Sequence, residues 1–446
     1  LLVDASNAFN ALNRAAAINN IPKVCPAAGR VFVNTYQADI PLYLDGGEVL
    51  YSREGTCQGD PLAMAFYALA TVPLAAQLGS ASESTAQIWY ADDDAAADKI
   101  QPLRRYWSAI EEAGPQYGYY PNAKKTVLLV RPHLLAEAQE AFAGTGVRIQ
   151  TDGVRYLGGA IGSQQFQNDF VLDRVAGMCR LVKRLAGLAV TQPQAAYRLF
   201  VASLQSRWTF LQRVVPADPA VYSPLDRAIN DDLLPALTGH TFRPDGALRQ
   251  LLSLPLRNGG LAMRIGSVRA EAERLLCCDA IDPMVTCVVV GLGERRVADV
   301  ISTSKALAVQ ARGRRRSQQL DILTGIKPDL SDQQRLLVDV AGEGGVSTWL
   351  GTPPSMHIPG SVFNKSDFRD ALCLRYDLSL DGVALSCVCG GEMSSHHALT
   401  CPSGGYPTQR HNELRDLLAD ALGSVVCDVA IEPPLMPLQG EAVSGS

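Results

Sequence analysis

The chain has 446 residues, of which 47% are hydrophobic and 19% charged, with a formal net charge of −5. This composition excludes a disordered protein and leaves room for roughly two to four domains with a sizeable core. The charge also argues against a general polyanion binder. We see no signal-peptide pattern, no apolar segment long enough to span a bilayer and no secreted disulfide framework among the eleven cysteines. We therefore expect an intracellular protein, cytoplasmic or nuclear.

Residues 1–162 mix strand and helix signals with Gly- and Asp-containing turns, which predicts an α+β layer arrangement. The opening "LLVD" has the character of a buried strand already under way, so we expect a fragment that lacks upstream sequence. Asp60 is the expected cap of a buried helix, because its side chain can accept a backbone N–H and Pro61 follows it. The predicted elements are a strand at 1–4, the buried helix from Asp60 to Leu78, a hairpin at 86–100, an amphipathic helix at 98–118 and a strand at 124–130.

Helical patterns dominate the rest of the chain. We expect helical regions at 163–245 and 246–380, and then a change of character at 381–446, where Cys, His and Gly precede a further helix. The basic run "RGRRRS", from Arg312 to Ser317, can supply positive surface for nucleic acid despite the negative net charge. A solvated helix face explains the same run equally well.

Three consecutive aspartates interrupt the hairpin in "QIWYADDDAAADK", and Asp4 ends the first strand. An Asp-rich stretch of this kind is either a solvated turn or a metal site. Two-metal phosphoryl transfer needs carboxylates that converge from separate strands, and Mg²⁺ prefers hard oxygen ligands. Asp4, Asp92 and Asp93 fit this requirement, whereas Asp94 is expected to be only a turn residue.

Several segments together resemble the motifs of reverse transcriptases of non-LTR-type retroelements. "DASNAFNALNR" is similar to motif A, "EGTCQGDPLAM" to motif B, "WYADD" to motif C and "GYYPNAKKT" to motif D, in the family's order. "YLGGAIG" is similar to the glycine-bearing segment that follows, and "LPLRNGGLAM" to a segment after the thumb. The resemblance implies an RNA-directed DNA polymerase of a retrotransposon, with an antiparallel-sheet palm packed on helices at 1–162, a helical thumb at 163–245 and a helical connection region at 246–380.

The resemblance also implies catalytic roles. Asp4 and Asp92 match the carboxylates that hold two Mg²⁺ ions, with Asp93 as the third acidic member. Lys125 matches the motif D lysine, a general acid for the pyrophosphate leaving group, and a lysine near developing negative charge can stabilise it or donate a proton. The implied reaction is attack of a primer 3′-hydroxyl on the α-phosphate of a dNTP, with an RNA template and a DNA primer as partners and no membrane.

The family's substrate contacts can be placed in the same way. Phe9 matches the aromatic residue that lies under the sugar and rejects a 2′-hydroxyl, and Gln58 and Gly59 match the motif B pair that touches the nascent base pair and the template strand. Without the motifs, Phe9 would be read as a core aromatic residue. Ala5 departs from the family, which often has an aromatic residue there. The fingers would lie before Leu1, so we expect the chain alone not to bind dNTP productively.

A Cys/His segment, "CVCGGEMSSHHALTC", lies near the end of the chain. Three thiolates and one imidazole within fifteen residues suit a structural tetrahedral Zn²⁺ site, although C-x-C is tighter than the usual C-x₂-C spacing. Reduced surface thiols beside unrelated histidines are the competing interpretation. His396 and His411 are alternatives for the imidazole. We expect a zinc knuckle at 381–411 with the ligands Cys387, Cys389, His397 and Cys401.

Residues 412–446 resemble the entry to a restriction-like nuclease found downstream in such elements, with Glu432 as its first acidic residue. The remaining acidic and lysine residues of such a nuclease have no match before Ser446, so we expect a truncated, inactive segment. Two alternatives to a working polymerase stay open. One is a catalytically inactive, retroelement-derived nucleic-acid-binding relic, and the other is a metal-dependent hydrolase unrelated to polymerases.

Overall fold

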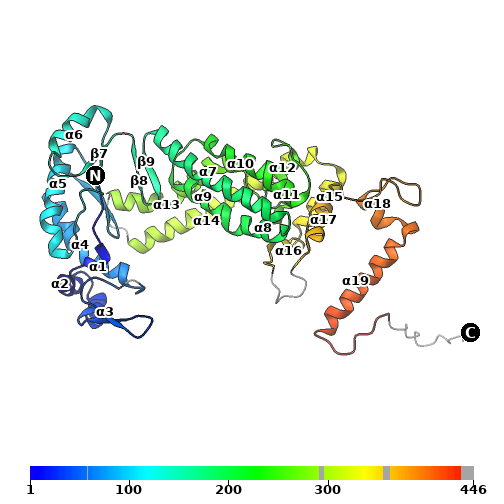
Figure 1. The fold of residues 1–446 in the computed structure, drawn as a ribbon, viewed down its shortest axis with the longest axis horizontal. Coiled ribbons are helices and arrows are strands. Elements are labelled where there is room, and N and C mark those ends of the chain that lie inside the picture. Colours follow the sequence, from blue (N-terminus) through cyan, green and yellow to red (C-terminus); the bar gives the residue numbers. More distant parts are fainter. Residues whose placement is uncertain (58, 291–295, 355–361, 433–446) are drawn as a thin grey trace, which may run out of the picture. The chain divides into compact units, whose positions relative to one another are not determined.

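The computed structural model describes residues 1–57, 59–290, 296–354 and 362–432, and the fold is α+β, as predicted (Figure 1). The chain forms two compact units, and each unit is built from three separate stretches of sequence. The first contains Leu1–Arg180, Leu204–Asp226 and Ile265–Gln318, and the second contains Leu181–Ser203, Arg227–Arg264 and Gln319–Ser446. The borders expected at 162, 245, 380 and 411 stay predictions.

A five-stranded sheet organises the start of the first unit. Its strand order is β4-β5-β1-β6-β7, in which β6 and β7 are parallel and the other neighbours antiparallel. The predicted first strand, hairpin and later strand are confirmed as β1, β4–β5 and β6. The strands are β1 (Leu2–Val3), β4 (Ala86–Tyr90), β5 (Asp93–Ala97), β6 (Val127–Leu129) and β7 (Arg148–Gln150).

Apolar side chains of the helices around this sheet form the core of the region. Phe32 of α3, Leu74 of α4 and Trp107 of α5 are completely buried. Burial of side chains of this size stabilises the fold by about 2 kcal/mol each. The helices are α1 (Ala8–Ala11), α2 (Arg14–Val24), α3 (Pro26–Tyr36), α4 (Ala63–Ala81), α5 (Ile100–Ala113) and α6 (Leu135–Ala141).

Helix α4 begins at Ala63, three residues after the expected start. Asp60 nevertheless caps it in part, because its Oδ1 accepts the backbone N–H of Leu62 at 2.8 Å. By length and composition α4 could cross a membrane, contrary to the expectation that the sequence holds no such segment. The core helix of a soluble protein meets the same test, and the α4 residues Phe66, Tyr67 and Leu78 are buried.

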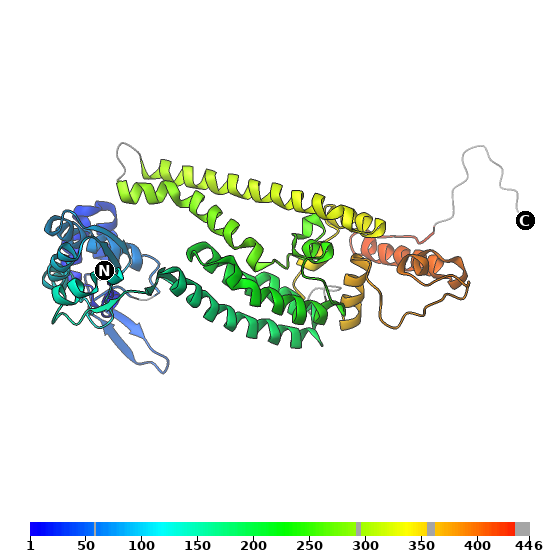
Figure 2. The same cartoon turned by 90° about the horizontal axis from the view of Figure 1, so that it is seen from above.

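Two further hairpins flank this region. The strands β2 (Ile40–Tyr43) and β3 (Val49–Ser52) form an exposed pair, and β8 (Gly153–Tyr156) and β9 (Gly159–Gly162) form another. The rest of the first unit is helical. It contains α9 (Gln205–Val214) and α13 (Gly266–Val290). It also contains the parts of α7 (Gln164–Ala189), α10 (Ser223–Ala228) and α14 (Val297–Ile326) up to residues 180, 226 and 318. Figure 2 shows α13 and α14 as long neighbouring helices.

The described residues of the second unit form helices joined by turns, with one isolated β-bridge between Ser386 and Glu392. The sequence predicts helices at 163–245 and 246–380. The segment "LPLRNGGLAM" crosses the core of this unit as an irregular turn. Gly259 has φ 77° and its carbonyl accepts the Tyr376 hydroxyl, while a Cβ on Gly260 would lie 2.0 Å from the Leu254 carbonyl oxygen. Both glycines are therefore required by packing. The helices are α8 (Pro193–Leu199), α11 (Leu234–Thr238), α12 (Ala247–Ser253), α15 (Asp332–Gly342), α16 (Thr348–Gly351), α17 (Lys365–Arg375), α18 (Ser395–Thr400) and α19 (Tyr406–Gly423).

Candidate active site and metal-binding cluster

The hairpin of β4 and β5 gives the three consecutive aspartates different structural positions. Tyr90 pairs with Asp93, so Ala91 and Asp92 are the two central turn residues. Ala91 has φ 55°, a positive value at the position where type II′ hairpin turns require one. Asp92 therefore lies at the tip of the hairpin and Asp93 opens the following strand.

Asp4 lies beside Asp93 because β1 and β5 are paired. The register joins Leu2 to Ala95 and Val3 to Asp94, and the same register continued by one residue brings Asp4 opposite Asp93. Side chains alternate between the two faces of a sheet, so Asp4 and Asp93 share one face while Val3 and Asp94 occupy the other. The pairing places Asp4 beside Asp93, and Asp92 precedes Asp93 at the hairpin tip. We call these three residues the aspartate cluster: Asp4, Asp92 and Asp93.

Asp94 is a core residue, and its assignment to a turn is wrong. It is completely buried, and its Oδ2 accepts the Tyr106 hydroxyl at 2.9 Å. Burial raises the pKa of Asp94 from 3.8 to about 7, although the hydrogen bond from Tyr106 acts in the opposite direction. The prediction failed because the side chain of Asp94, unlike that of Asp93, points toward α5.

The charges of the aspartate cluster interact. Burial raises the pKa of Asp93, and the negative charges of Asp92 and Asp4 raise it further. Lys125, just before β6, lies with its Nζ 3.4 Å from Asp4 Oδ1, so the structure also brings the predicted lysine to the cluster. Both side chains are substantially exposed, at 64% for Lys125 and 40% for Asp4, which leaves this ion pair open to rearrangement by a bound substrate.

Tyrosines surround the cluster, and sequence reasoning missed them. The Tyr119 hydroxyl donates to the Asp92 carbonyl at 3.0 Å and thereby fixes the hairpin tip. Burial and the charge of Asp92 raise the pKa of Tyr67, and burial, followed by the charges of Asp93 and Asp94, raises the pKa of Tyr156 to about 12. These phenols stay protonated at neutral pH, and the buried Tyr67 hydroxyl has no hydrogen-bond partner in the described part of the chain.

Phe9 and the loop before α4 pack together next to this site. The Phe9 ring lies 4.6 Å from the Tyr67 ring, and the Phe9 carbonyl accepts the Thr56 N–H at 2.8 Å. Gly55 has φ 74°, and a Cβ there would lie 2.4 Å from the Phe9 carbonyl oxygen. Arg14 stabilises the contact between Phe9 and this loop, because its buried guanidinium donates to the Gly55 carbonyl at 2.8 Å.

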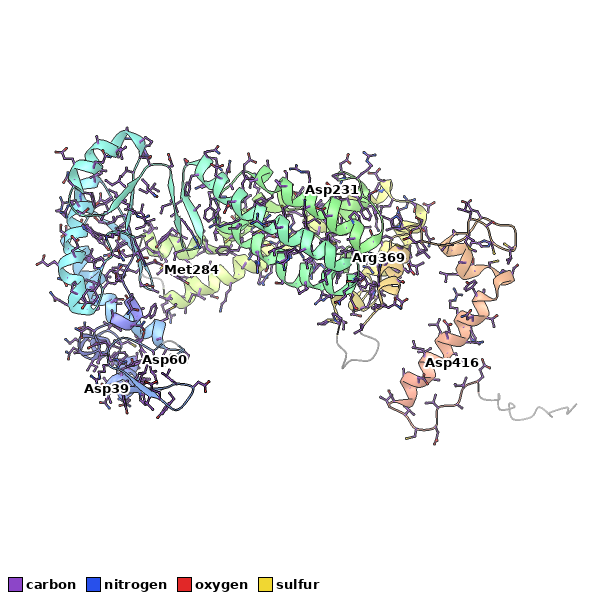
Figure 3. The ribbon with its side chains drawn as sticks, viewed as in Figure 1. Asp39, Asp60, Asp231, Met284, Arg369 and Asp416 are labelled. Atoms are coloured by element: carbon purple, nitrogen blue, oxygen red, sulfur yellow. The ribbon has the colours of Figure 1, made fainter. Side chains whose placement is uncertain are left out.

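Two predicted substrate residues lie in this same loop. Gln58 lies outside the described residues. Gly59 is exposed with φ 96°, and a Cβ there would meet no atom within 4 Å, so its backbone is open to a ligand. The Tyr36 hydroxyl donates to Asp60, seen in Figure 3, and accepts the Cys57 N–H, which ties the loop to α3.

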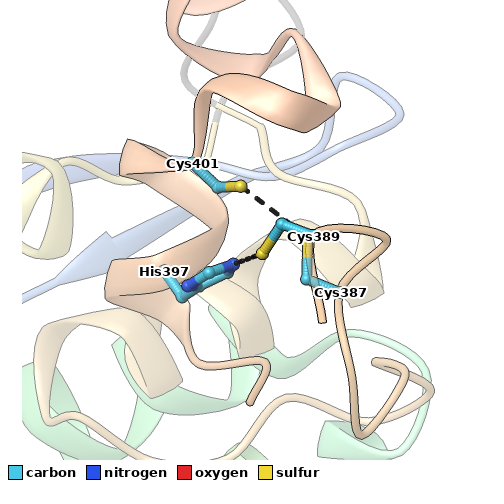
Figure 4. A group of neighbouring side chains, drawn as sticks. All are labelled: Cys387, Cys389, His397 and Cys401. Carbon is cyan, nitrogen blue, oxygen red and sulfur yellow. Dashed lines mark hydrogen bonds between the residues drawn. The ribbon is translucent and has the colours of Figure 1, made fainter. Parts of the chain in front are cut away.

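A second cluster lies in the second unit and contains the four predicted zinc ligands. One ligand atom from each of its residues lies within 4.8 Å of the other three, an arrangement that could hold a metal ion such as zinc (Figure 4). The sulfurs of Cys387 and Cys401 are 3.8 Å apart, and Cys389 Sγ lies 3.2 Å from His397 Nε2. We call this group the cysteine–histidine cluster: Cys387, Cys389, His397 and Cys401.

Local backbone geometry explains this second cluster. The Cys387 N–H donates to the Gly391 carbonyl at 2.9 Å across a tight turn, where Gly390 has φ 83°. A Cβ on Gly391 would lie 3.0 Å from the His397 ring, so a side chain there would press on this histidine. A backbone hydrogen bond from Ser403 lowers the pKa of Cys401 to about 7, which favours the thiolate that metals bind.

The other predicted residues of the tail lie outside this cluster. His396 precedes the ligand histidine on α18, and its backbone carbonyl accepts the Thr400 hydroxyl. His411 lies on α19, with its Nε2 3.9 Å from Glu432 Oε1. Glu432 also pairs with Arg415 at 2.8 Å, so its carboxylate is engaged in surface ion pairs.

No protein-family model matches this chain, and a search of curated proteins finds no match either.

Proposed function

We propose that this chain is the polymerase portion of a retroelement reverse transcriptase, which extends a DNA primer on an RNA template. The observation that carries the proposal is the pairing that sets Asp4 beside Asp93, with Asp92 at the adjoining hairpin tip and Lys125 at 3.4 Å from Asp4. The order of the motif-like segments along the chain supports the same conclusion. On this proposal the five-stranded sheet and its helices are the palm.

The donor set of the aspartate cluster suits Mg²⁺, because it consists of carboxylate oxygens from separate elements. Bound Mg²⁺ supplies activation of a hydroxyl nucleophile and stabilisation of a pyrophosphate leaving group. Lys125, exposed and beside Asp4, has the reach and charge to meet the leaving phosphates and to donate a proton there.

Phe9 and the loop at 54–60 would line the nucleotide side of the site. Their packing supports this proposal, because Gly55 and Thr56 hold the loop against Phe9 and leave Gly59 exposed. The aromatic ring of Phe9 rests on Tyr67 and so has a fixed position from which to exclude a 2′-hydroxyl. Gly59, without a side chain, permits close approach of a template strand.

The cysteine–histidine cluster would hold one structural Zn²⁺. Three sulfurs and one imidazole nitrogen match the soft donors and the number that structural zinc requires. All four come from the protein, which leaves no open position for a reacting water, so the role we propose is to fold the segment at 381–411.

Primer extension tests the polymerase proposal. The assay uses an RNA template, a DNA primer, dNTPs and Mg²⁺, with the protein joined to any sequence that its gene encodes upstream of Leu1. We expect template-directed incorporation that Asp92→Asn abolishes, with the variant's thermal unfolding unchanged. Absence of incorporation by the folded wild-type protein would instead favour the nucleic-acid-binding relic.

A further inference from the structure

A basic pocket lies between α9, α13 and α14 of the first unit, and no residue of either cluster lines it. Its volume is about 310 Å³, within the range of small-ligand sites. Ala308, Ala311, Arg312 and Arg315 line it from one face of α14, spaced as helix neighbours three and four residues apart. The remaining lining residues are Arg213 on α9 and Leu276, Cys277, Ala280 and Ile281 on α13.

One buried carboxylate holds the arginines of this pocket together. Glu273 on α13 is 1% exposed and accepts three guanidinium groups, with Arg213 at 3.2 Å, Arg269 at 3.2 Å and Arg315 at 2.6 Å. Burial raises the pKa of Glu273, but the three arginines lower it by more, so the carboxylate is charged. This network orients Arg213 and Arg315 before any ligand arrives.

The arginines of this pocket outnumber the one carboxylate, Glu273, that pairs with them. Within the described part of the chain, Arg312 makes no ion pair, and the buried Nε of Arg315 has no hydrogen-bond partner. Three guanidinium groups line the pocket (Arg213, Arg312 and Arg315), and the carboxylate of Glu273 pairs with two of them. Arg213 and Arg312 are exposed and Arg315 is half-buried, so a ligand of opposite charge can reach these guanidinium groups and compensate their positive charge.

The opposite side of the same helix pair differs. There Arg314 pairs with Asp279 at 3.0 Å, and Asp282 lies beside them, so acids outnumber arginines among the lining residues. Arg314 is two residues from Arg312 but points to another face of α14. The two pockets on this helix pair therefore differ in charge, with arginines in excess in one and acids in excess in the other.

We propose that this basic pocket binds a phosphate group, taken from the sugar–phosphate backbone of a nucleic acid. Planar guanidinium groups match phosphate oxygens with paired hydrogen bonds, and clustered arginines favour phosphate over more weakly charged anions. The phosphate chemistry rests on the pocket alone, whereas the choice of a nucleic acid rests on the proposed polymerase function. The run "RGRRRS" therefore has two roles, with Arg312 and Arg315 binding the ligand and Arg314 pairing within the fold.

Fluorescence anisotropy with a labelled RNA–DNA hybrid tests the proposal on the full chain. Arg312→Gln should weaken binding roughly tenfold and reduce the salt slope between about 50 and about 200 mM by about 1. Arg314→Gln removes the same charge from the same helix and should leave the affinity within about twofold of the wild type and the salt slope unchanged. Equal effects of the two substitutions would overturn the proposal.

A second measurement distinguishes a nucleic-acid phosphate from a free phosphate compound as the ligand. Inorganic phosphate at constant ionic strength should raise the Tm of the wild type and not that of Arg312→Gln. If this shift appears while hybrid affinity is the same in both proteins, the pocket binds a free phosphate compound and the nucleic-acid source is wrong. If phosphate does not shift the Tm and Arg312→Gln does not change the affinity for the hybrid, the proposal that the pocket binds phosphate is wrong. Neither readout uses incorporation, so an inactive polymerase site would leave the result intact.

Discussion

The aspartate cluster and the cysteine–histidine cluster assemble in opposite ways. The first draws its carboxylates from β1 and the β4–β5 hairpin, which are brought together by pairing over about ninety residues of sequence. The second gathers its four donors within one short segment, through a glycine turn and one turn of α18. A preformed scaffold thus positions the carboxylates, whereas the thiols and the imidazole depend on their own segment.

This difference predicts different responses to loss of a ligand. The core under the aspartate cluster, with Trp107, Tyr106 and Leu74 fully buried, stays folded when one carboxylate is neutralised. The segment around the cysteine–histidine cluster has little core of its own, and Leu385 and Val388 are 91% and 87% exposed. We therefore expect its order to depend on metal binding, because the free energy of binding is also free energy of folding.

The largest expected effect is loss of metal from the cysteine–histidine cluster. Cys401→Ser should lower zinc affinity by about a thousandfold or more, since a thiolate ligand is replaced by a weak hydroxyl donor. Zinc content of the purified protein, measured by atomic emission, checks this. Cys427→Ser is the matched control, because Cys427 is exposed and outside the cluster. Equal zinc in all three proteins would rule out the assignment.

The next largest effect is expected from substitution of Lys125, which lies beside the aspartate cluster. Lys125→Ala should slow incorporation by about a hundredfold through loss of a proton donor and of a positive charge near the leaving phosphates. Lys125→Arg keeps the charge but donates a proton poorly, and should recover only part of the rate. Single-turnover rates with an RNA template measure both. Wild-type rates in the alanine variant would remove Lys125 from the mechanism.

Asp94 provides a smaller effect that depends on pH. Its pKa is about 7 in the folded protein and 3.8 ordinarily, so the folded state binds the extra proton between these values. The stabilisation this provides is complete below about pH 4 and is lost as the pH rises toward 7. Asp94→Asn, which keeps an acceptor for Tyr106, should equal the wild type at pH 4 and be more stable by about 1–3 kcal/mol at pH 8.

Urea unfolding at the two pH values measures this difference. Asp39→Asn is the control, since Asp39 is half exposed and pairs with Arg53 at the surface. It should change the free energy of unfolding by about 0.5 kcal/mol or less at either pH. A stability difference for Asp94→Asn that is independent of pH would show that Asp94 stays ionised in the core.

The sequence patterns correctly predicted the features that depend on residues close together in the chain. The Asp-rich turn, the α5 periodicity and the Cys/His spacing all gave elements that the structure contains. Asp94 escaped prediction because its burial depends on α5 packing behind β5, and Arg14 because its acceptors, Ser52 and Gly55, come from a distant loop. The Glu273 network joins three helices and has no signature in any single stretch of sequence.

Adjacent aspartates give the most direct test of the central claim. We would measure primer extension on an RNA template with Mg²⁺ for Asp93→Asn and Asp94→Asn side by side. The two substitutions remove the same charge from neighbouring residues that point to opposite faces of the sheet. Asp93→Asn should lower the rate by about 10²–10³-fold, while Asp94→Asn stays within about threefold of the wild type. Equal losses in both, or activity retained by Asp93→Asn, would contradict a metal-dependent polymerase site at the aspartate cluster.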